Sequence, residues 1–251
     1  MGCGVLNGVI RLDPPLAPPP AAALQLWFLD VKGAEPGESA GGEGEELDVS
    51  VLDEQERARA ARMRGEDRST FLAAHVLLRR LLAELLGVEP QDIAYRREPC
   101  PWCGSPRGRP ALQRPSRPLH FSLSRRAGVV MIAIASAQVG VDIEALPTDA
   151  TVSEVAELLH PAEREEILSA PLATRAAIFA RVWTRKEAYL KGVGIGVGHG
   201  LDRDYLGTQE RAPGPVGWAV IDVPVAAGYG AAVAVGGTGA PSRHASAPAF
   251  R

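Results

Sequence analysis

The segment Val182–Gly192, VWTRKEAYLKG, decides the fold of the C-terminal part of the chain. At 100° per residue, this segment predicts an amphipathic helix. Lys186 lies in the middle of its apolar face, in line with Trp183, Leu190 and the preceding Phe179. Glu187 and Lys191 lie together at the edge of that face. Lys186 is then either a snorkelling side chain beside an ordinary i,i+4 ion pair, or a residue with a function of its own.

The rarity of lysine favours the second interpretation. The chain has 27 Lys and Arg residues, of which only Lys32, Lys186 and Lys191 are lysines. Lysine is a compact point charge that can sit against a phosphate or lose a proton, whereas arginine is a planar fork that stays charged. We therefore expect Lys186 and Lys191 to do something that arginine would do badly.

Length, charge and cysteine content indicate an intracellular protein. The 251 residues, 46% of them hydrophobic, suffice for one sizeable core or two small ones, and the net charge of −3 does not suggest nucleic-acid binding. Three cysteines make no disulfide framework, and no apolar run is long enough to cross a membrane. We expect a cytoplasmic protein without nucleic-acid or membrane partners.

Four segments are expected to lack regular structure. Residues 1–21 and 237–251 are rich in Pro and Ala and predict disordered tails, and residues 33–46 carry five Glu and predict a mobile loop. Residues 95–118 contain six arginines and one glutamate, with prolines that oppose regular structure, so they predict an exposed, stiff, basic loop. The Cys100/Cys103 pair in this loop is at most half of a zinc site.

Helix and strand signals fill the space between these segments. Asp53 with Glu56 predicts a helix start by a capping box, Gly65 interrupts that helix, and Phe71–Leu86 continues it as far as Gly87. Three segments with strand patterns follow: 119–124, 129–136 and 139–146.

The second half of the chain repeats the plan of the first. A shift of 107 residues aligns six identical pairs: Leu52/Leu159, Glu56/Glu163, Arg57/Arg164, Arg68/Arg175, Ala73/Ala180 and Gly87/Gly194. The same shift pairs Arg79 with Lys186. We predict an α+β fold of two similar halves, 22–138 and 139–236, related by a pseudo-twofold axis, each a small, mostly antiparallel sheet packed on a long helix. Ligands often occupy such a seam.

Acidic and basic residues suggest chemistry on a phosphate group. Asp142 and Glu144 are i and i+2 on a predicted strand, so their carboxylates share a face and repel each other unless a cation such as Mg²⁺ lies between them. A solvent-facing strand edge is the alternative. Arg109 lies in the segment RGRPAL, and Arg125 follows Ser124 at a predicted turn. Together with these carboxylates they favour a di- or triphosphate-like substrate.

These residues match a known family. VGVDIE, followed some forty residues later by VWTRKEAYLKGVGIG, resembles the paired signature of 4′-phosphopantetheinyl transferases. The upstream GRPAL and HFSLSRR look like the family's G-K-P and F-N-x-S-H-S elements, in the expected order. The resemblance runs from about Asp53 to Val235, and the two halves resemble the monomeric, Sfp-type branch.

The resemblance implies an enzyme that transfers 4′-phosphopantetheine from coenzyme A to a serine of an acyl or peptidyl carrier protein, releasing 3′,5′-ADP. Such transfer activates apo carriers for fatty acid, polyketide or nonribosomal peptide biosynthesis. By position, Mg²⁺ (or Mn²⁺) would be held by three carboxylates: Asp142, Glu144 and Glu187. Coenzyme A would be bound by five residues: Arg59, Arg109, Ser124, Arg125 and Lys191. The catalytic residues would be Glu187, Lys191 and Lys186.

Two departures and two alternatives accompany this interpretation. Arg125 stands where the family usually has His, which puts a proton-transfer role there in doubt, and Ser122 stands where it has Asn. One alternative is a degenerate protein that binds coenzyme A or a carrier without chemistry. The other is a Mg²⁺-dependent nucleotide hydrolase.

Overall fold

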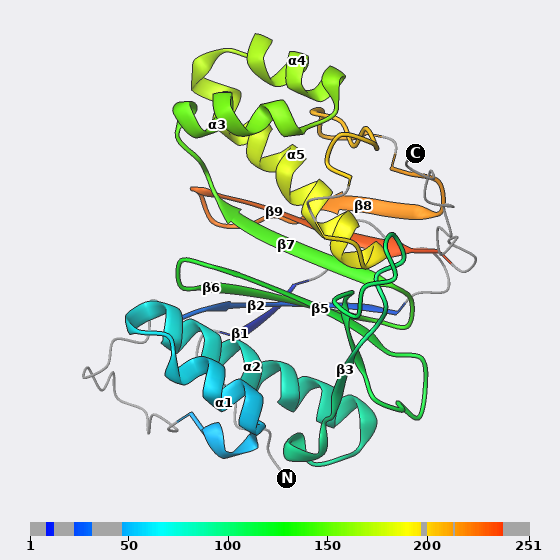
Figure 1. The fold of residues 1–251 in the computed structure, drawn as a ribbon. Helices are drawn as coiled ribbons and strands as arrows, with labels where there is room; N and C mark the ends of the chain where they lie inside the picture. The colour runs from blue at the N-terminus through cyan, green and yellow to red at the C-terminus, as the bar shows by residue number, and fades with distance from the viewer. Residues whose placement is uncertain (1–8, 13–22, 32–46, 197–199, 213, 238–251) are drawn as a thin grey trace.

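The computed structural model describes residues 9–12, 23–31, 47–196, 200–212 and 214–237. They form an α+β fold in which two antiparallel sheets are stacked between helices (Figure 1). The first sheet has the order β1-β2-β6-β5, with strands at Val9–Leu12, Leu24–Asp30, Val129–Ala135 and His120–Arg126. The second has the order β7-β9-β8, with strands at Val139–Ala145, Tyr229–Gly236 and Trp218–Asp222.

The core fills the space between the two sheets. β6 reads VVMIAIA and is buried along its whole length, because alternate side chains point to opposite, covered faces. Met131 packs toward the second sheet against Val141 and Val233, whereas Ile132 faces the helices on the other side. Burial on both faces explains why this strand is apolar throughout.

Each sheet is covered on its outer face by one long helix. α2 (Gly65–Leu86) packs on the first sheet and α5 (Leu172–Val193) on the second, with apolar contacts along both. Shorter helices complete the two layers: α1 (Glu54–Ala61), α3 (Asp149–Val155) and α4 (Pro161–Ser169), with 3₁₀ turns η1 (Val49–Val51), η2 (Pro90–Asp92) and η3 (Ala156–Leu158). No helix in the described ranges is long and apolar enough to span a membrane.

The predicted start of α1 and the predicted ends of the two long helices are confirmed, whereas α2 begins at Gly65 and not at Phe71. Asp53 caps α1, with its side chain and that of Glu56 forming the capping box, and α2 starts at Gly65. The two long helices end at Gly87 and Gly194, whose φ angles of 68° and 92° lie in the left-handed region that glycine tolerates best.

The aligned pairs of the sequence repeat make equivalent ion pairs. In the first half, Nε of the fully buried Arg79 lies 2.7 Å from Oε2 of Glu56. In the second half, Nζ of Lys186 lies 2.7 Å from Oε2 of Glu163. A cation on the long helix therefore pairs with a glutamate from a preceding short helix in both halves.

Two predictions about irregular segments need correction. Val9–Leu12, inside the predicted N-terminal tail, form strand β1, which pairs antiparallel with β2. Within 95–118, β3 (Tyr95–Arg97) pairs with β4 (Pro110–Leu112) to form a hairpin, not an irregular loop. Pro110 is compatible with this hairpin because it is the first residue of its strand. The rest of both tails, from 1–8, 13–21 and 238–251, and the acidic segment 33–46 lie outside the described residues.

Candidate active site

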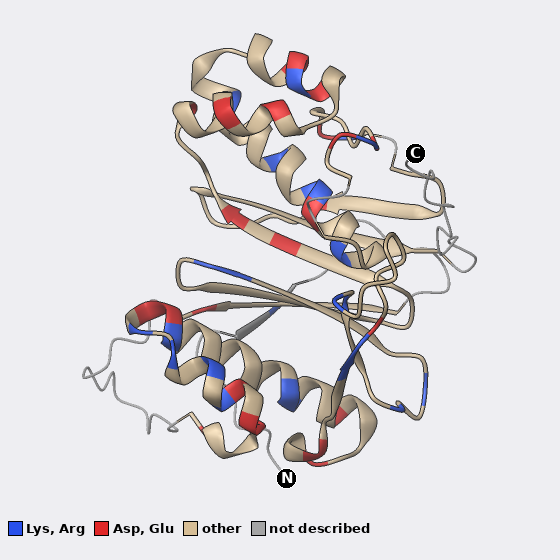
Figure 2. Ribbon diagram, in the orientation of Figure 1, with Lys and Arg blue, Asp and Glu red and all other residues tan. Residues whose placement is uncertain are grey.

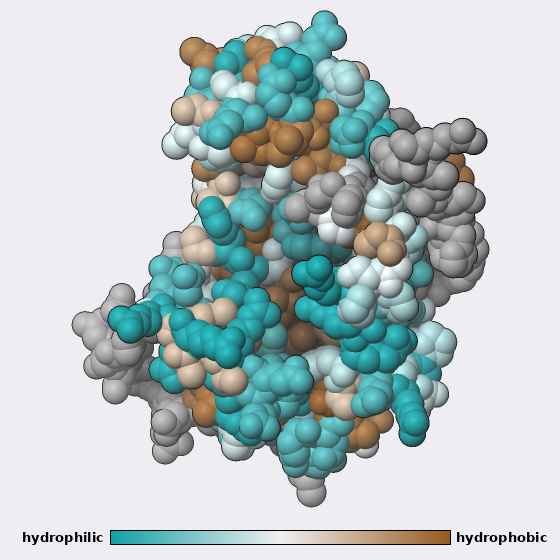
Figure 3. Space-filling view, viewed as in Figure 1, coloured by the Kyte–Doolittle hydropathy of each residue, from teal (hydrophilic) through white to brown (hydrophobic). Residues whose placement is uncertain are grey.

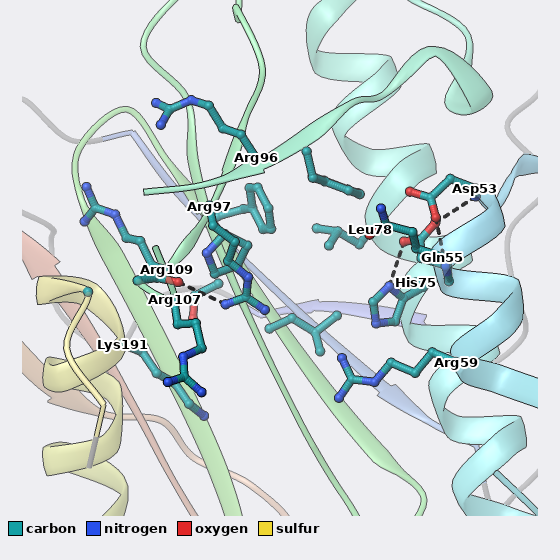
Figure 4. Close-up of a pocket in the computed structure, with 18 of the residues that line it drawn as sticks. Asp53, Gln55, Arg59, His75, Leu78, Arg96, Arg97, Arg107, Arg109 and Lys191 are labelled. Atoms are coloured by element: carbon teal, nitrogen blue, oxygen red, sulfur yellow. Dashed lines mark hydrogen bonds and ion pairs between the residues drawn. The ribbon is translucent and has the colours of Figure 1, made fainter. Parts of the chain in front are cut away.

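A cleft opens between α1 and α2, the β3–β4 hairpin and the end of α5. Its larger part is a cavity of about 870 Å³, and an adjoining cavity of about 380 Å³ lies over β5 and β7. Figure 3 shows the hollow, apolar at its base with a hydrophilic rim, and Figure 4 shows the larger cavity in detail. Five residues line both parts: Arg59, Phe71, His75, Leu123 and Lys191.

The close approach of α5 to β7 brings the two signature motifs together. Gly140 on β7 faces α5 so closely that an added Cβ would lie 1.9 Å from the carbonyl oxygen of Ala188. Gly192 occupies the same contact from the helix side, between Trp218 and Gly140. Because neither position has a side chain, the last turns of α5 lie directly on the strand that carries Asp142.

Asp142 is the buried centre of the smaller cavity. Its side chain is 2% exposed, and Oδ1 accepts hydrogen bonds from Nζ of Lys191 at 2.5 Å and from Oγ of Ser124 at 2.8 Å. Its other oxygen, Oδ2, is buried and has no hydrogen-bond partner among the described residues. A buried carboxylate oxygen without a donor is costly unless a further donor or a cation satisfies it.

Two more carboxylates line the same cavity. Glu144 shares the strand face of Asp142 and makes an ion pair with Arg126 at 3.1 Å, and burial followed by the charge of Asp142 raises its pKa. Burial, and then Asp142, raise the pKa of Glu187 to about 7. The acids therefore repel one another, with Lys191 only partly neutralising them. Figure 2 shows acidic positions on β7 and both acidic and basic positions on the neighbouring end of α5.

This set of hard oxygen donors, with the unpaired Oδ2 of Asp142, fits a divalent cation such as Mg²⁺. As the side chains stand, however, the described residues include no group of three or more His, Cys, Asp or Glu drawn together closely enough to hold a metal ion. The ammonium of Lys191 instead occupies one oxygen of Asp142.

Arg109 lies beside Lys191 at the mouth of the cleft. Its Nε donates to Oε2 of Glu98 at 2.6 Å, and its Nη1 donates to the carbonyl oxygen of Gly192 at 2.5 Å. The hairpin is thus fixed to the end of α5, and Arg109 and Lys191 line the larger cavity together (Figure 4).

Phe71 and His75 are cleft residues that the sequence did not single out. They are one turn apart on α2, and their rings stack with centroids 4.0 Å apart. The guanidinium carbons of Arg59 and Arg125 lie 5.4 and 5.3 Å from the centre of the Phe71 ring. Burial, followed by the nearby Arg59, lowers the pKa of Arg125. The only sequence signal was a histidine within an apolar helix.

The structure does not bring Lys186 to the cleft. It is 2% exposed and lines neither cavity; its Nζ bonds Glu163 and the carbonyl oxygen of Asp204. Burial lowers its pKa, and Glu163 opposes that shift. This position gives no support to the catalytic role that we expected, because a side chain buried in an ion pair does not reach the cleft. All the other predicted site residues line the cleft.

Comparison with known proteins finds relatives that match most of the chain. Residues 138–219 match the model of the 4′-phosphopantetheinyl transferase superfamily. The chain is 32% identical over 222 residues to a phosphopantetheinyl transferase of Thraustochytrium sp.. The aligned residues make up 81% of this chain and 71% of that protein. The chain is also 32% identical over 200 residues to the 4′-phosphopantetheinyl transferase HetI of Nostoc sp. (76% and 81%) and over 182 residues to psf-1 of Bacillus pumilus (71% and 70%).

Proposed function

The chain belongs to the 4′-phosphopantetheinyl transferase superfamily, and from that premise we propose that the cleft between α1, α2, the β3–β4 hairpin and the end of α5 is where the reaction takes place. The enzyme transfers the phosphopantetheine group of coenzyme A onto carrier proteins. We infer that the acceptor is a serine of an acyl or peptidyl carrier and that the other product is 3′,5′-ADP. The observation that carries the proposal is the contact of Lys191 with both Asp142 and Ser124 inside the cleft.

The phosphates of coenzyme A are assigned to the cations of the cleft. Lys191 and Arg109 lie on one side of the larger cavity, and Arg59 lies on the other (Figure 4). Ser124 and Arg125 line the adjoining cavity. Cations in a partly buried cleft attract the multiply charged coenzyme, and Lys and Arg side chains are suited to its phosphate oxygens.

Asp142, Glu144 and Glu187 would hold the Mg²⁺ ion, or Mn²⁺ in its place. Bound there, the ion would neutralise charge on the diphosphate of the coenzyme. Support comes from the unpaired Oδ2 of Asp142 and from the mutual repulsion that raises the pKa values of Glu144 and Glu187. A coordinating cation would bind the unpaired oxygen and would reduce the repulsion between the carboxylates.

The remaining chemistry belongs to side chains of α5. The carrier serine oxygen forms a bond to the phosphorus that carries the pantetheine arm, and the bond from that phosphorus to the bridging oxygen breaks. Glu187 accepts the proton of the serine hydroxyl, and Lys191 stabilises the negative charge that develops on the departing 3′,5′-ADP. Lys186 fixes the register of α5 through Glu163 and does not touch the reacting atoms.

One chain would supply the whole cleft. We infer that the halves 22–138 and 139–236 are related by a pseudo-twofold axis, which the equivalent ion pairs and the Gly87 and Gly194 caps support. The cleft residues come from both halves, so a monomer would be complete. The described cysteines, Cys100 and Cys103, are free thiols, in keeping with the cytoplasmic location that we expect.

The basic segment 95–118 is assigned to the carrier protein. Arg96 and Arg114 are exposed, and the β3–β4 hairpin forms one rim of the cleft. Carrier proteins of this family are expected to be acidic around the modified serine. Complementary charge at the rim would steer the carrier toward the cleft and raise its association rate.

Mass spectrometry of a carrier protein separates this proposal from its alternatives. Purified apo carrier is incubated with the full chain, coenzyme A and Mg²⁺, and the nucleotide products are measured in the same sample. A gain of the phosphopantetheine mass together with 3′,5′-ADP is expected. Free 3′,5′-ADP with unmodified carrier would indicate hydrolysis, and the absence of both would indicate binding without chemistry.

A further inference from the structure

Alternate side chains of β5 contact β7, and each of these strands is the edge strand of its sheet. Oγ of Ser122 accepts from a backbone N–H of β7 at 3.1 Å, and Oγ of Ser124 donates to Asp142 at 2.8 Å. Two residues further along the same face of β5, Nε of Arg126 lies 3.1 Å from Oε2 of Glu144. Figure 2 shows basic positions at this end of β5 and acidic positions on β7. The strand opposite the proposed metal site thus places a guanidinium on the more exposed of its two β7 carboxylates.

Each carboxylate of β7 therefore has a cation of the chain at one of its oxygens. Nζ of Lys191 lies 2.5 Å from Oδ1 of Asp142, and Arg126 lies at Oε2 of Glu144. A divalent ion that binds both carboxylates brings two further positive charges to the same place. Because like charges at such distances repel, the ion binds most favourably when one of the two side chains leaves.

Arg126 is the side chain that can leave. It is 58% exposed, lines neither cavity and is the last residue of β5, so its guanidinium can turn into water. Lys191, by contrast, also hydrogen-bonds Ser124 inside the cleft. Among the described residues, Glu144 is the only ion-pair partner of Arg126. Release of Arg126 therefore breaks one ion pair, and the guanidinium stays charged whether it is bound or free.

We propose that Arg126 is a positioning residue that holds Glu144 in the metal-free protein and releases it when a divalent ion binds, so that it weakens binding of the free ion. The inference rests on the proposed function, which assigns Glu144 to the metal ion. Arg126 does not touch the reacting atoms and acts only through Glu144. Its effect is to make occupancy by the ion depend on the coenzyme, because the diphosphate oxygens supply ligands that the free ion lacks.

The test measures binding of Mn²⁺, which takes the same oxygen ligands as Mg²⁺ and whose free form is measured by electron paramagnetic resonance. The full chain and its Arg126→Gln variant are titrated with Mn²⁺ in the absence of coenzyme and carrier. We expect Arg126→Gln to lower the Kd for Mn²⁺ about 2- to 5-fold, the range for one partly exposed ion pair. Arg126→Lys, which keeps the charge, should bind Mn²⁺ as weakly as the wild type.

The difference between the wild type and Arg126→Gln should also depend on salt. Because the guanidinium is exposed, KCl screens its interaction with Glu144 and with the ion. The ratio of the two Kd values should therefore approach one as the KCl concentration is raised. A purely structural role of Arg126 would give no such trend.

Arg164→Gln is the matched control. Nη2 of Arg164 lies 2.6 Å from Oε1 of Glu157, and this exposed pair lines neither cavity. The variant loses the same charge away from β7, so its Kd for Mn²⁺ should equal that of the wild type. Asp142→Ala, combined with Arg126→Gln, should remove the binding and so locate the ion in the cleft. Circular dichroism establishes that each variant is folded.

Equal Kd values for the wild type and Arg126→Gln, or an equal gain in Arg164→Gln, would overturn the proposal and leave the metal site in place. Binding that survives Asp142→Ala would place the ion elsewhere and would overturn it too. Absence of Mn²⁺ binding in both the wild type and Arg126→Gln would overturn the metal assignment on which the proposal rests. The expected pattern of Mn²⁺ binding without transfer to a carrier would support the role of Arg126 and contradict the proposed chemistry.

Discussion

Nζ of Lys191 lies 2.5 Å from Oδ1 of Asp142, although the two residues are 49 positions apart in the chain. The contact joins the end of α5 to β7, and Ser124 of β5 hydrogen-bonds the same carboxylate oxygen. The three elements that carry the sequence motifs therefore meet at one buried carboxylate. This contact is the basis of the first prediction.

Lys191→Arg should damage transfer far more than Arg109→Lys, although both substitutions keep the charge. The ammonium of Lys191 fits between Asp142 and Ser124 as a point charge, and a planar fork would not. Arg109→Lys removes one of the two hydrogen bonds that residue 109 makes to Glu98 and to the carbonyl oxygen of Gly192. It keeps a positive charge at the mouth of the cleft. Steady-state kinetics should show a loss of kcat of about 100-fold for Lys191→Arg and mainly a raised KM for Arg109→Lys. Similar rates for the two variants would contradict the assignment.

Removal of the metal ion should stop transfer. Excess EDTA is expected to abolish the activity of the wild type, and added Mg²⁺ should restore it. Glu187→Ala removes a proposed ligand and the proposed base at once, and should lower kcat about 100- to 1,000-fold. The rate of carrier modification measures both effects. Wild-type turnover in excess EDTA would exclude the metal assignment.

The Lys186–Glu163 pair should matter for stability and not for catalysis. Lys186→Met leaves Glu163 buried without its cation and should lower the free energy of unfolding by about 3–5 kcal/mol. A second change, Glu163→Gln, removes the unpaired charge, and its amide oxygen can still accept from the backbone N–H groups of Leu206 and Gly207.

Urea unfolding should therefore find the double variant more stable than Lys186→Met alone. Transfer per folded molecule should equal that of the wild type in both variants, measured at a temperature where each is folded. A loss of kcat in the folded double variant would return Lys186 to the catalytic residues.

Neutralising exposed arginines of the segment 95–118 should weaken carrier recognition. Arg96→Gln with Arg114→Gln is expected to raise the KM for the carrier several-fold and to flatten its dependence on salt, because exposed charges act mainly on association. Arg117, whose guanidinium donates to the carbonyl oxygen of Leu85, is left in place to preserve the fold. An unchanged carrier KM and salt response would show that the segment has no part in docking.

The sequence contained most of the site because its residues lie in locally regular elements. Asp142 and Glu144 share a face by strand alternation, and Glu187 and Lys191 share one by helical spacing, so each pair could be placed before the fold was seen. The capping box at Asp53 and the glycine stop at Gly87 are likewise local signals.

Features that depend on packing between elements were missed or misread. The rarity of lysine led us to expect a function for Lys186. Helical spacing reveals only the face on which Lys186 lies, so it did not show that its partner Glu163 lies on another helix. The sequence repeat already indicated this partner. It aligns Glu56 with Glu163 and Arg79 with Lys186, and in each half the glutamate forms an ion pair with the cation. His75 faces the cleft only because α1 supplies Glu56 and α2 packs against the first sheet.

The most direct test of the central claim is single-turnover transfer by an Asp142→Ala variant. Intact-mass spectrometry follows apo carrier mixed with excess enzyme, coenzyme A and Mg²⁺, and circular dichroism establishes that the variant is folded. Because Asp142 anchors Lys191 and Ser124 and offers Oδ2 to the metal ion, we predict that the wild type converts the carrier to the phosphopantetheinylated form and that the folded variant leaves it unmodified. Conversion by Asp142→Ala at the wild-type rate would contradict the account.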